Sequence, residues 1–378
     1  MSVFVRGAAM ATVQRGTARA LTWQDCVRTA REALGSAGTS PTEIGTLVVG
    51  TMMASRILSQ QQLAAKLATE LGIQGTTLTI DAACGSGGAA IHMGTRIVRT
   101  DAKPVLVVGV EHMRWQNTAW VTEALARASD WETEGALGET FVSLNGTLME
   151  AYLERYGGTS DDLNHAPRIA HTNAATNPHA LYRRGWDGMA YTESKRIHPH
   201  FRLFDASAIC NGSAALCLSP TGQVGVHPRI TGSAASTDAL ALSKRSDPLS
   251  LDAVRRSTRD CLDEADRTHD EIDFAEPHDA YSIMTAATLE AAGFVPNGMF
   301  SKWGERGHFQ DVLPICTFGG LKARGHPVGA SGVYQAVEAV KQCTHAAPPF
   351  IQVLNARVGL TQSIGGAGTA VYTHIFEL

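Results

Sequence analysis

Three segments in the first half of this 378-residue chain recur in the second half, in the same order. The matching pairs are 43–49 with 271–276, 84–91 with 325–333, and 211–219 with 365–373. Internal similarity of this kind indicates duplicated structural units. Apolar strand-like runs alternate with helical patterns between these segments, which favours a largely parallel α/β sheet. The sequence therefore predicts two similar α/β halves related by pseudo-symmetry.

The first half, residues 1–225, contains a break in composition. Residues from about 112 to 205 are polar, rich in His, Asn, Arg and Trp, and poor in long apolar runs. We interpret them as an insertion that covers a site. Core character returns after residue 205, and the second half spans 226–378. The elements expected in the first half are strands at 3–13, 47–50, 104–110 and 214–218, and helices at 22–34 and 60–71.

Composition excludes several classes of protein. Hydrophobic residues make up 44% of the chain and charged residues 18%, as in compact enzymes. The net charge is −4 and no basic run is present, which argues against nucleic acid as a partner. We expect a cytoplasmic protein without a membrane span, since no signal-like or spanning segment is recognisable. The seven cysteines lack CxxC spacing, so neither a metal site nor a disulfide framework is expected.

The run from Thr79 to Ala90 places Cys84 between a β-branched strand and a Gly/Ala-rich helix start. A turn there exposes the sulfur, and the helix N-terminus supplies partial positive charge that stabilises a thiolate. Taken alone, such a cysteine is more often a buried structural residue. The other motifs turn the interpretation toward a nucleophile.

His326 lies in the second glycine-rich run, Gly319 to Gly332. A histidine at this position can accept the thiol proton and hold the pair as thiolate and imidazolium. The repeat would place it at a turn equivalent to that of Cys84, facing the same cleft. A structural histidine at a helix entry is the alternative interpretation.

Two further runs complete the expected constellation. His278 follows a predicted strand and can donate a hydrogen bond to an oxyanion, with Asp279 fixing its tautomer. A backbone N–H in the run 363–366 can form a second donor beside the Cys84 amide. Each signal is weak alone, and a structural role for His278 is the more common case.

Together these motifs resemble the thiolase superfamily, and specifically its sterol-carrier-protein-2 type. The Cys84 turn resembles the nucleophile motif, and 319–332 resembles the Gly-His-Pro motif. The residues His278-Asp279-Ala280-Tyr281 stand where that type has His-Asp-Cys-Phe. Segments 152–157, 173–178 and 204–207 of the insertion agree in order and spacing, so the resemblance covers nearly the whole chain.

The resemblance implies a thiolase fold of two βαβαβαββ halves in five layers, α/β/α/β/α, acting on acyl-CoA without a cofactor. It implies that Cys84 forms an acyl-enzyme, that His326 activates it, and that His278 and His326 bind the second thioester. The amides of Cys84 and Gly365 would form an oxyanion hole. A homodimer or tetramer is implied, and so is a small OB-fold, zinc-binding partner protein.

The chain departs from the family where a second cysteine usually moves a proton. Ser363 and Ala280 occupy its two usual places. Cys316, Ser363 and Tyr281 are the candidate substitutes, although packing is the commoner role for such residues. Transfer of the acyl group to oxygen or nitrogen of a small metabolite is therefore an alternative to C–C bond formation, and so is a non-enzymatic subunit of a complex. Retro-aldolases of this fold usually lack the nucleophilic cysteine, so Cys84 argues against that activity.

The insertion and one position of the repeat carry two further features. Four tryptophans in the insertion, Trp115, Trp120, Trp131 and Trp186, suggest a bulky or aromatic acyl pocket. Asn211 stands where the family usually has Asp.

Overall fold

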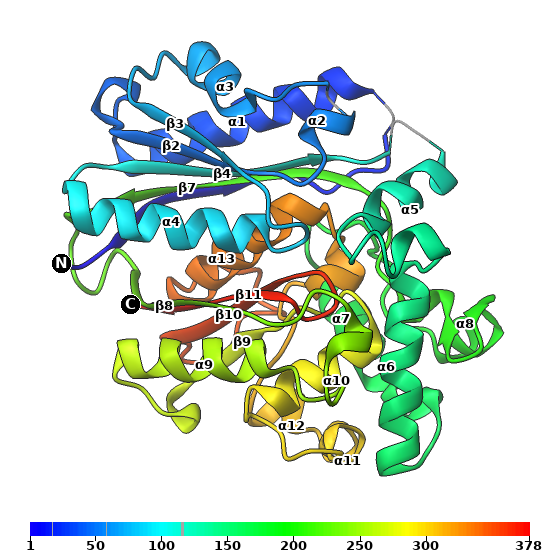
Figure 1. Cartoon of the computed structure of the whole chain (residues 1–378). Coiled ribbons are helices and arrows are strands. Elements are labelled where there is room, and N and C mark those ends of the chain that lie inside the picture. Colours follow the sequence, from blue (N-terminus) through cyan, green and yellow to red (C-terminus); the bar gives the residue numbers. More distant parts are fainter. Residues whose placement is uncertain (17, 58, 115–116) are drawn as a thin grey trace.

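Five layers are stacked in the computed structural model, which describes residues 1–16, 18–57, 59–114 and 117–378 (Figure 1). From top to bottom they are helices, a sheet, a central pair of helices, a second sheet and a further layer of helices. Strands covered on both faces can be apolar throughout. The continuous burial of β4 (Val105–His112) and β7 (Asn211–Ser219) follows from this arrangement. The predicted α/β/α/β/α fold is confirmed.

The first half of the chain forms the upper sheet. Its strands lie in the order β3-β2-β4-β7-β1, with β2 parallel to both β3 and β4 and with β7 antiparallel to β4 and β1. Helices α1 and α3 cover the outer face, and α4 covers the inner face (Figure 1). The remaining elements are β1 (Phe4–Met10), α1 (Arg19–Ala37), β2 (Thr46–Gly50), α2 (Ala54–Ile57), α3 (Leu63–Leu71), β3 (Thr76–Ile80) and α4 (Ser86–Asp101).

The second half repeats this arrangement in the lower sheet, with strand order β8-β11-β10-β9. The expectation of a largely parallel sheet is wrong, because the pairs β1–β7, β4–β7, β10–β11 and β8–β11 are antiparallel and, among the described strands, only β2–β3, β2–β4 and β9–β10 are parallel. Ile315 makes an isolated parallel bridge to Ala275 of β9, where the upper sheet has β3 beside β2. A bridge between Phe4 and Arg229 joins β1 to β8. The elements are β8 (Arg229–Thr237), α9 (Asp252–Ala265), β9 (Phe274–Glu276), α10 (Ser282–Ala291), α11 (Phe300–Glu305), α12 (His308–Asp311), α13 (Ser331–Cys343), β10 (Val358–Gly365) and β11 (Ala370–Glu377).

The predicted repeat is confirmed element by element. Its three pairs of segments form β2 and β9, the starts of α4 and α13, and β7 and β11. Both β2 and β9 are preceded by a capped 3₁₀ turn, in which the carboxylate three residues after Ser40 or Thr268 accepts from its backbone N–H. The starts of α4 and α13 meet closely, because a Cβ on Gly87 would lie 2.9 Å from the Gly332 nitrogen.

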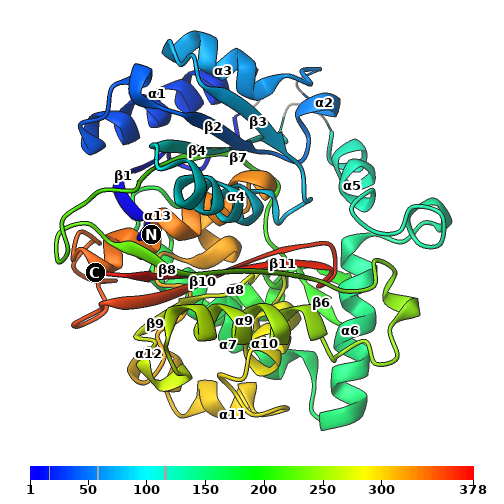
Figure 2. The same cartoon turned by 60° about the vertical axis from the view of Figure 1, so that its left-hand side comes forward.

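The insertion leaves the upper sheet after β4 and returns at β7. Its helices and a short hairpin stand at one end of the two sheets, beside the N-termini of α4 and α13 (Figures 1 and 2). The expected boundary at 225/226 falls in the connection between β7 and β8. Among the described residues, no helix is long and apolar enough to cross a membrane. The insertion contains α5 (Thr118–Ala126), α6 (Phe141–Tyr156), α7 (His165–Ala174), α8 (Gly188–Glu193), β5 (Arg196–His198) and β6 (Phe201–Arg202).

Candidate active site

A cavity of about 440 Å³ lies where the two halves and the insertion meet. Cys84 reaches it from the first half, and His278 and His326 reach it from the second. The structure therefore brings together the three residues that the sequence singled out. Much of the remaining wall is apolar, and its apolar side chains include Met113, Leu125, Phe141, Val142, Ile197, Leu203, Ile209, Met284 and Val328.

The turn that carries Cys84 is built by its polar neighbours. The Asp81 carboxylate accepts a hydrogen bond from the Ala83 N–H, at 2.9 Å. The Ser86 hydroxyl accepts from the Ala82 N–H at 2.9 Å and donates to the Ala83 carbonyl at 2.6 Å. These bonds hold Ala83 in the left-handed region, with φ of 53°, immediately before the cysteine. As predicted, the chain turns sharply here between β3 and α4.

Burial, and after it the charge of the Glu111 carboxylate, raise the pKa of the Cys84 thiol to about 12. Glu111 is itself buried, and it accepts hydrogen bonds from the N–H groups of Met52, Met53 and Gly329. It thereby links the first half to the loop that follows His326. With this raised pKa, Cys84 is a neutral thiol near neutral pH, in contrast to the expected thiolate–imidazolium pair.

His278 is held in one tautomer by a backbone group. The Ile364 N–H donates to His278 Nδ1 at 3.2 Å, which assigns the ring proton to Nε2. Burial lowers the pKa of His278 to about 3, so the ring is neutral. The expectation that Asp279 fixes this tautomer is wrong, because its carboxylate accepts from the Leu321 and Lys322 N–H groups instead.

His326 is held in the opposite tautomer. Its Nδ1 lies 2.7 Å from the Ser331 hydroxyl, which donates to the Pro327 carbonyl at 3.2 Å and thus accepts from Nδ1–H. Its Nε2 is buried and has no hydrogen-bond partner in the described part of the chain. Burial lowers the pKa of His326 well below its usual value. The two imidazole centroids are 5.2 Å apart, so the site offers one N–H donor and one nitrogen acceptor side by side.

Of the three candidates for the second acid or base, one lines the cavity and two do not. Tyr281 lines the cavity, and burial raises its pKa. Cys316 is buried beside Asp279 and is not among the lining residues. Ser363 is also outside the lining, and its hydroxyl donates to the Cys84 carbonyl at 3.4 Å. A structural role in supporting the Cys84 turn accounts for this serine.

The run 363–366, in which a second oxyanion donor was predicted, reaches the Cys84 turn. Gly365 packs against the Cys84 turn so tightly that a side chain there would collide with the Ala82 carbonyl. The next residue, Gly366, lines the cavity. The Ile364 N–H is used to orient His278, which removes it from the candidate donors. The pairing of the Cys84 and Gly365 amides stays a prediction.

The tryptophans of the insertion do not line the cavity. Trp186 packs against the rings of His171, Tyr191 and Phe204, and the Arg127 guanidinium lies over Trp131. Trp120 packs among the apolar residues around Cys84 but is absent from the cavity wall. Trp115 lies outside the described residues. For the three described tryptophans, the suggested acyl-pocket role is wrong.

Two residues that support the site, Ser331 and Glu111, were not identified from the sequence, and Asn211 was noted there without a role. Ser331 stands five residues after His326, inside the motif already recognised. Asn211 begins one of the repeated segments. Glu111 had no signal of its own, since a single acid at a strand end is common on a protein surface.

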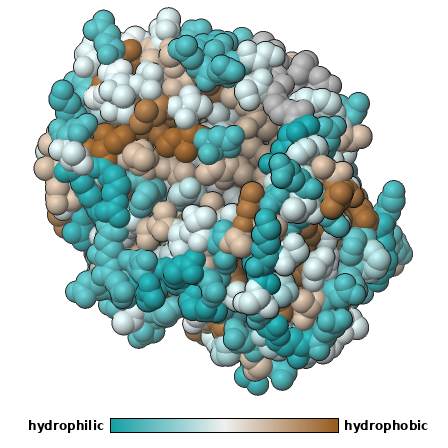
Figure 3. Space-filling model, in the orientation of Figure 1, coloured by the Kyte–Doolittle hydropathy of each residue, from teal (hydrophilic) through white to brown (hydrophobic). Residues whose placement is uncertain are grey.

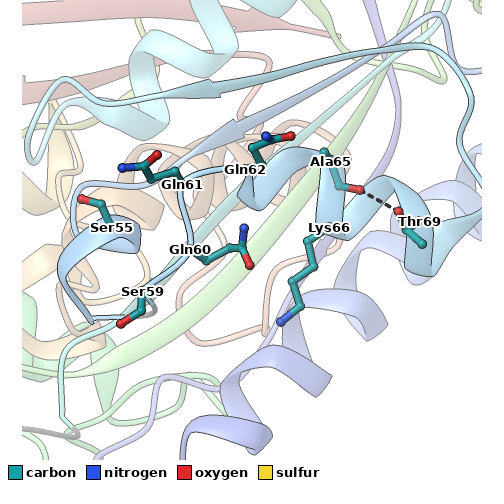
Figure 4. A pocket seen from close by; sticks show the side chains of 8 residues that line it. All are labelled: Ser55, Ser59, Gln60, Gln61, Gln62, Ala65, Lys66 and Thr69. Atoms are coloured by element: carbon teal, nitrogen blue, oxygen red, sulfur yellow. Dashed lines mark hydrogen bonds between the residues drawn. The ribbon is translucent and has the colours of Figure 1, made fainter.

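A second hollow of about 730 Å³ lies on the outside of the upper layer, between α2 and α3 (Figure 4). Its wall is formed by serine, threonine and glutamine side chains, Ala65 and Lys66. The Lys66 ammonium lies 4.5 Å from the Trp23 ring centroid. None of the candidate catalytic residues reaches it.

Comparison with known proteins agrees with this geometry. Residues 3–182 match the thiolase N-terminal domain, and residues 234–378 match the thiolase C-terminal domain-like family. The chain is 33% identical to an acetyl-CoA acetyltransferase of Methanothermobacter thermautotrophicus over 91% of both chains. It is 26% identical to sterol carrier protein 2 of Bos taurus over 80% of this chain and 59% of that protein. An Ltp2–ChsH2(DUF35) aldolase structure superposes with a TM-score of 0.86 at 19% identity, covering 100% of this chain and 97% of that one. The chain belongs to the thiolase family.

Proposed function

We propose that this thiolase is an acyltransferase that forms an acyl-enzyme on Cys84 from acyl-CoA, and makes or cleaves a β-ketoacyl thioester. The observation that carries the proposal is the pair of neutral histidines of opposite tautomer in the same cavity as Cys84. The relative named acetyl-CoA acetyltransferase supports the same chemistry.

In the first half-reaction, Cys84 Sγ attacks the thioester carbonyl while its proton passes to His326 Nε2. The developing oxyanion is stabilised by backbone N–H groups, for which the Cys84 and Gly365 amides are the predicted donors. The bond from carbonyl carbon to CoA sulfur then breaks, and the CoA thiolate takes the proton from His326. Because His326 is neutral beforehand, it can accept the proton of a thiol that is itself neutral.

In the second half-reaction, the carbonyl oxygen of another acyl-CoA accepts a hydrogen bond from His278 Nε2–H. His326 Nε2 removes the α-proton, and the resulting carbanion attacks the acyl carbonyl. The bond to Cys84 sulfur breaks, and the sulfur recovers the proton from His326. In this proposal His326 replaces the absent second cysteine, since neither Cys316 nor Ser363 lines the cavity and burial raises the pKa of Tyr281, which disfavours its anion as a base. The reverse sequence cleaves a β-ketoacyl thioester.

Acyl transfer to oxygen or nitrogen of a small metabolite is the second candidate. It is favoured by one observation, that Cys84 is the sole cysteine among the described residues lining the cavity. Such a transfer needs no carbon deprotonation, so a second thiol is unnecessary.

Incubation with a panel of acyl-CoAs tests the proposal. Peptide mass spectrometry should find one acyl group on Cys84 and none on the six other cysteines, which are buried and do not line the cavity. Formation of acetoacetyl-CoA from acetyl-CoA supports C–C bond formation, whereas a labelled Cys84 without this product supports the second candidate. Absence of any acyl group on Cys84 with every donor contradicts both.

The histidines should add no step to the pH dependence of acylation near their ordinary pKa. Both histidine pKa values are lowered by burial, so the base stays neutral as the pH falls and is lost only near its depressed pKa. The two rings therefore contribute no step to the single-turnover rate of Cys84 acylation between about pH 5.5 and 8.5. Burial raises the pKa of Glu111 to about 7, so this carboxyl titrates beside Cys84 in the same range. In Glu111→Gln the rate is expected to change less than about threefold across the range, and a fall centred on about pH 6.5 in that variant would show that one ring titrates normally.

We propose that two copies of the chain pair through β3 to form the expected dimer. β3 ends the sheet, and it exposes Thr76, Leu78 and Thr79 on an edge that no described strand covers. Leu78 of β3 and Met93 of α4 are exposed. Figure 3 shows an apolar patch at the upper left of the molecule, where Figure 1 shows the upper sheet and α4. An open, partly apolar edge favours strand pairing with another chain.

Changing Leu78 to lysine should shift the protein from dimer to monomer, because a charge on the edge opposes pairing. Sedimentation velocity measures the shift. Leu354→Lys is the matched control, since Leu354 is 86% exposed and lies between α13 and β10 of the second half. A dimer that survives Leu78→Lys unchanged would rule out this edge.

We also propose that a small OB-fold, zinc-binding protein associates with the chain. The resemblance implies it, and the Ltp2–ChsH2(DUF35) aldolase combines a protein of this fold with a second component. Condensation activity of the isolated chain equal to that measured with such a protein would argue against the association.

A further inference from the structure

Two arginines line the cavity together with the catalytic residues. Arg15 lies in the loop after β1, and Arg114 lies just after β4. Among the described lining residues these are the fully charged side chains, and Asp, Glu and Lys are absent from that wall. His278 and His326 are neutral, so the two guanidinium groups set the sign of the electrostatic potential at this end of the cavity.

Neither arginine is neutralised within the described part of the chain. The Arg15 guanidinium lies over the Tyr182 ring, 4.6 Å from its centroid. Arg114 Nε lies 3.5 Å from the Arg15 carbonyl oxygen, which is a long contact. No carboxylate in that part of the chain pairs with either guanidinium, although 14 other Lys or Arg pairings with Asp or Glu are formed. Each arginine therefore keeps donors available for a ligand.

The Asn211 side chain links the two loops that carry these arginines through hydrogen bonds. Its Oδ1 accepts hydrogen bonds from the N–H groups of Met113 and Arg114, at 2.8 and 2.9 Å. Its Nδ2 donates to the Gly16 carbonyl at 2.6 Å. The side chain is 3% exposed, so these bonds form away from water. An aspartate at this position could accept the first two bonds but could not donate to Gly16. The bond to Gly16 therefore explains why this position holds asparagine and not aspartate.

We propose that Arg15 and Arg114, positioned by Asn211, form an anion-binding site for a carboxylate or phosphate of the thioester substrate. The inference rests on the proposed function, because it makes this the site of the acyl-CoA. Guanidinium groups bind both anions through paired, charge-assisted hydrogen bonds. Two parts of such a substrate carry this chemistry: a carboxylate at the far end of the acyl chain, and the phosphates of CoA.

To tell the acyl carboxylate from the CoA phosphates, three thioesters are compared in the wild type and in the double variant Arg15→Gln/Arg114→Gln. They are butyryl-CoA, glutaryl-CoA with its terminal carboxylate, and butyryl-pantetheine, which has no phosphate. The readout is the concentration that gives half the maximal rate of Cys84 acylation. Loss of charge-assisted hydrogen bonds should raise it about tenfold or more. A rise confined to glutaryl-CoA identifies the acyl carboxylate. A rise for both CoA esters, but not for butyryl-pantetheine, identifies the CoA phosphates.

Equal half-saturation values in wild type and double variant, within about twofold for all three thioesters, would overturn the site. Arg184→Gln is the matched control, since Arg184 is exposed and absent from the cavity wall. It should leave all three values unchanged. Thermal unfolding of each variant shows whether the fold is kept.

Asn211→Asp tests the positioning role. It should raise the half-saturation value for the same thioesters as the arginine change, with a smaller effect on the maximal rate. A uniform fall in the maximal rate for every thioester would instead indicate general structural damage and would contradict the positioning role.

Failure of the proposed function is distinguishable from failure of this site. Should the wild type acylate with none of the thioesters, calorimetric titration of CoA and glutaryl-CoA into the wild type and the double variant gives the same comparison through binding alone. Affinities that do not differ between the two proteins would then overturn the anion site.

Discussion

Replacing Cys84 by serine is expected to abolish the acyl-enzyme, with a fall in single-turnover acylation of roughly 10⁴-fold or more. A hydroxyl is far less acidic than a thiol, and the same burial that raises the thiol pKa would oppose an alkoxide still more strongly. His326 cannot offset this difference, because burial also weakens it as a base. Rapid mixing with acetyl-CoA, followed by intact-mass analysis, measures the loss.

Cys316→Ala is the matched control for this experiment. Cys316 is a buried thiol that the cavity does not include, so its removal should leave acylation and product formation within a few-fold of wild type. An acyl group recovered in Cys84→Ser at the wild-type rate would place the nucleophile elsewhere. Loss of product formation in Cys316→Ala, with acylation and stability retained, would restore this thiol as the missing proton carrier.

Replacing His326 by glutamine should slow acylation of Cys84 by about 10²–10⁴-fold, the usual contribution of a general base. The buried Nε2 is the sole unpartnered acceptor nitrogen on the cavity wall among the described residues, so no neighbour can take over the proton. In the proposed sequence His326 acts in both half-reactions. Acylation and carbon–carbon bond formation should therefore fall together.

His278→Gln provides the contrast. His278 donates from Nε2 to the second thioester, so this variant should acylate Cys84 within about tenfold of wild type but form product about 10²–10³-fold more slowly. Acylation is read by mass spectrometry and product by chromatography of the CoA esters. Equal losses of acylation in the two histidine variants would contradict the division of roles drawn from their tautomers.

The tautomers of His278 and His326 could not be predicted from the sequence. Motif spacing correctly brought His278 and His326 to one cavity with Cys84. It assigned the orientation of His278 to Asp279, the neighbouring acid, because nearness along the chain is the information that a sequence offers. In the folded protein the Ile364 N–H fills that role from 86 residues away, and Asp279 instead binds two backbone groups near residue 321.

The protonation state of the site depended on tertiary packing in the same way. A cysteine before a helix start predicts a lowered thiol pKa, since the helix dipole favours an anion. The surrounding apolar residues and the buried Glu111 reverse that direction, and neither can be recognised from the Cys84 motif. Residue types alone left Cys316, Ser363 and Tyr281 as candidates. Their placement left Tyr281 in the cavity and the other two behind its wall.

The amino-acid sequence by itself determined the duplicated α/β halves, the inserted segment and the three residues that meet between them. These features depend on local patterns, namely apolar strand-like runs, glycine-rich helix starts and their order. Such patterns can be recognised directly in the amino-acid sequence. Tertiary structure decided which atoms of those residues carry protons, which candidates reach the cavity, and that Asn211 joins the loops of Arg15 and Arg114. These properties arise from contacts between segments far apart in the sequence, where burial and hydrogen-bond geometry set the energies.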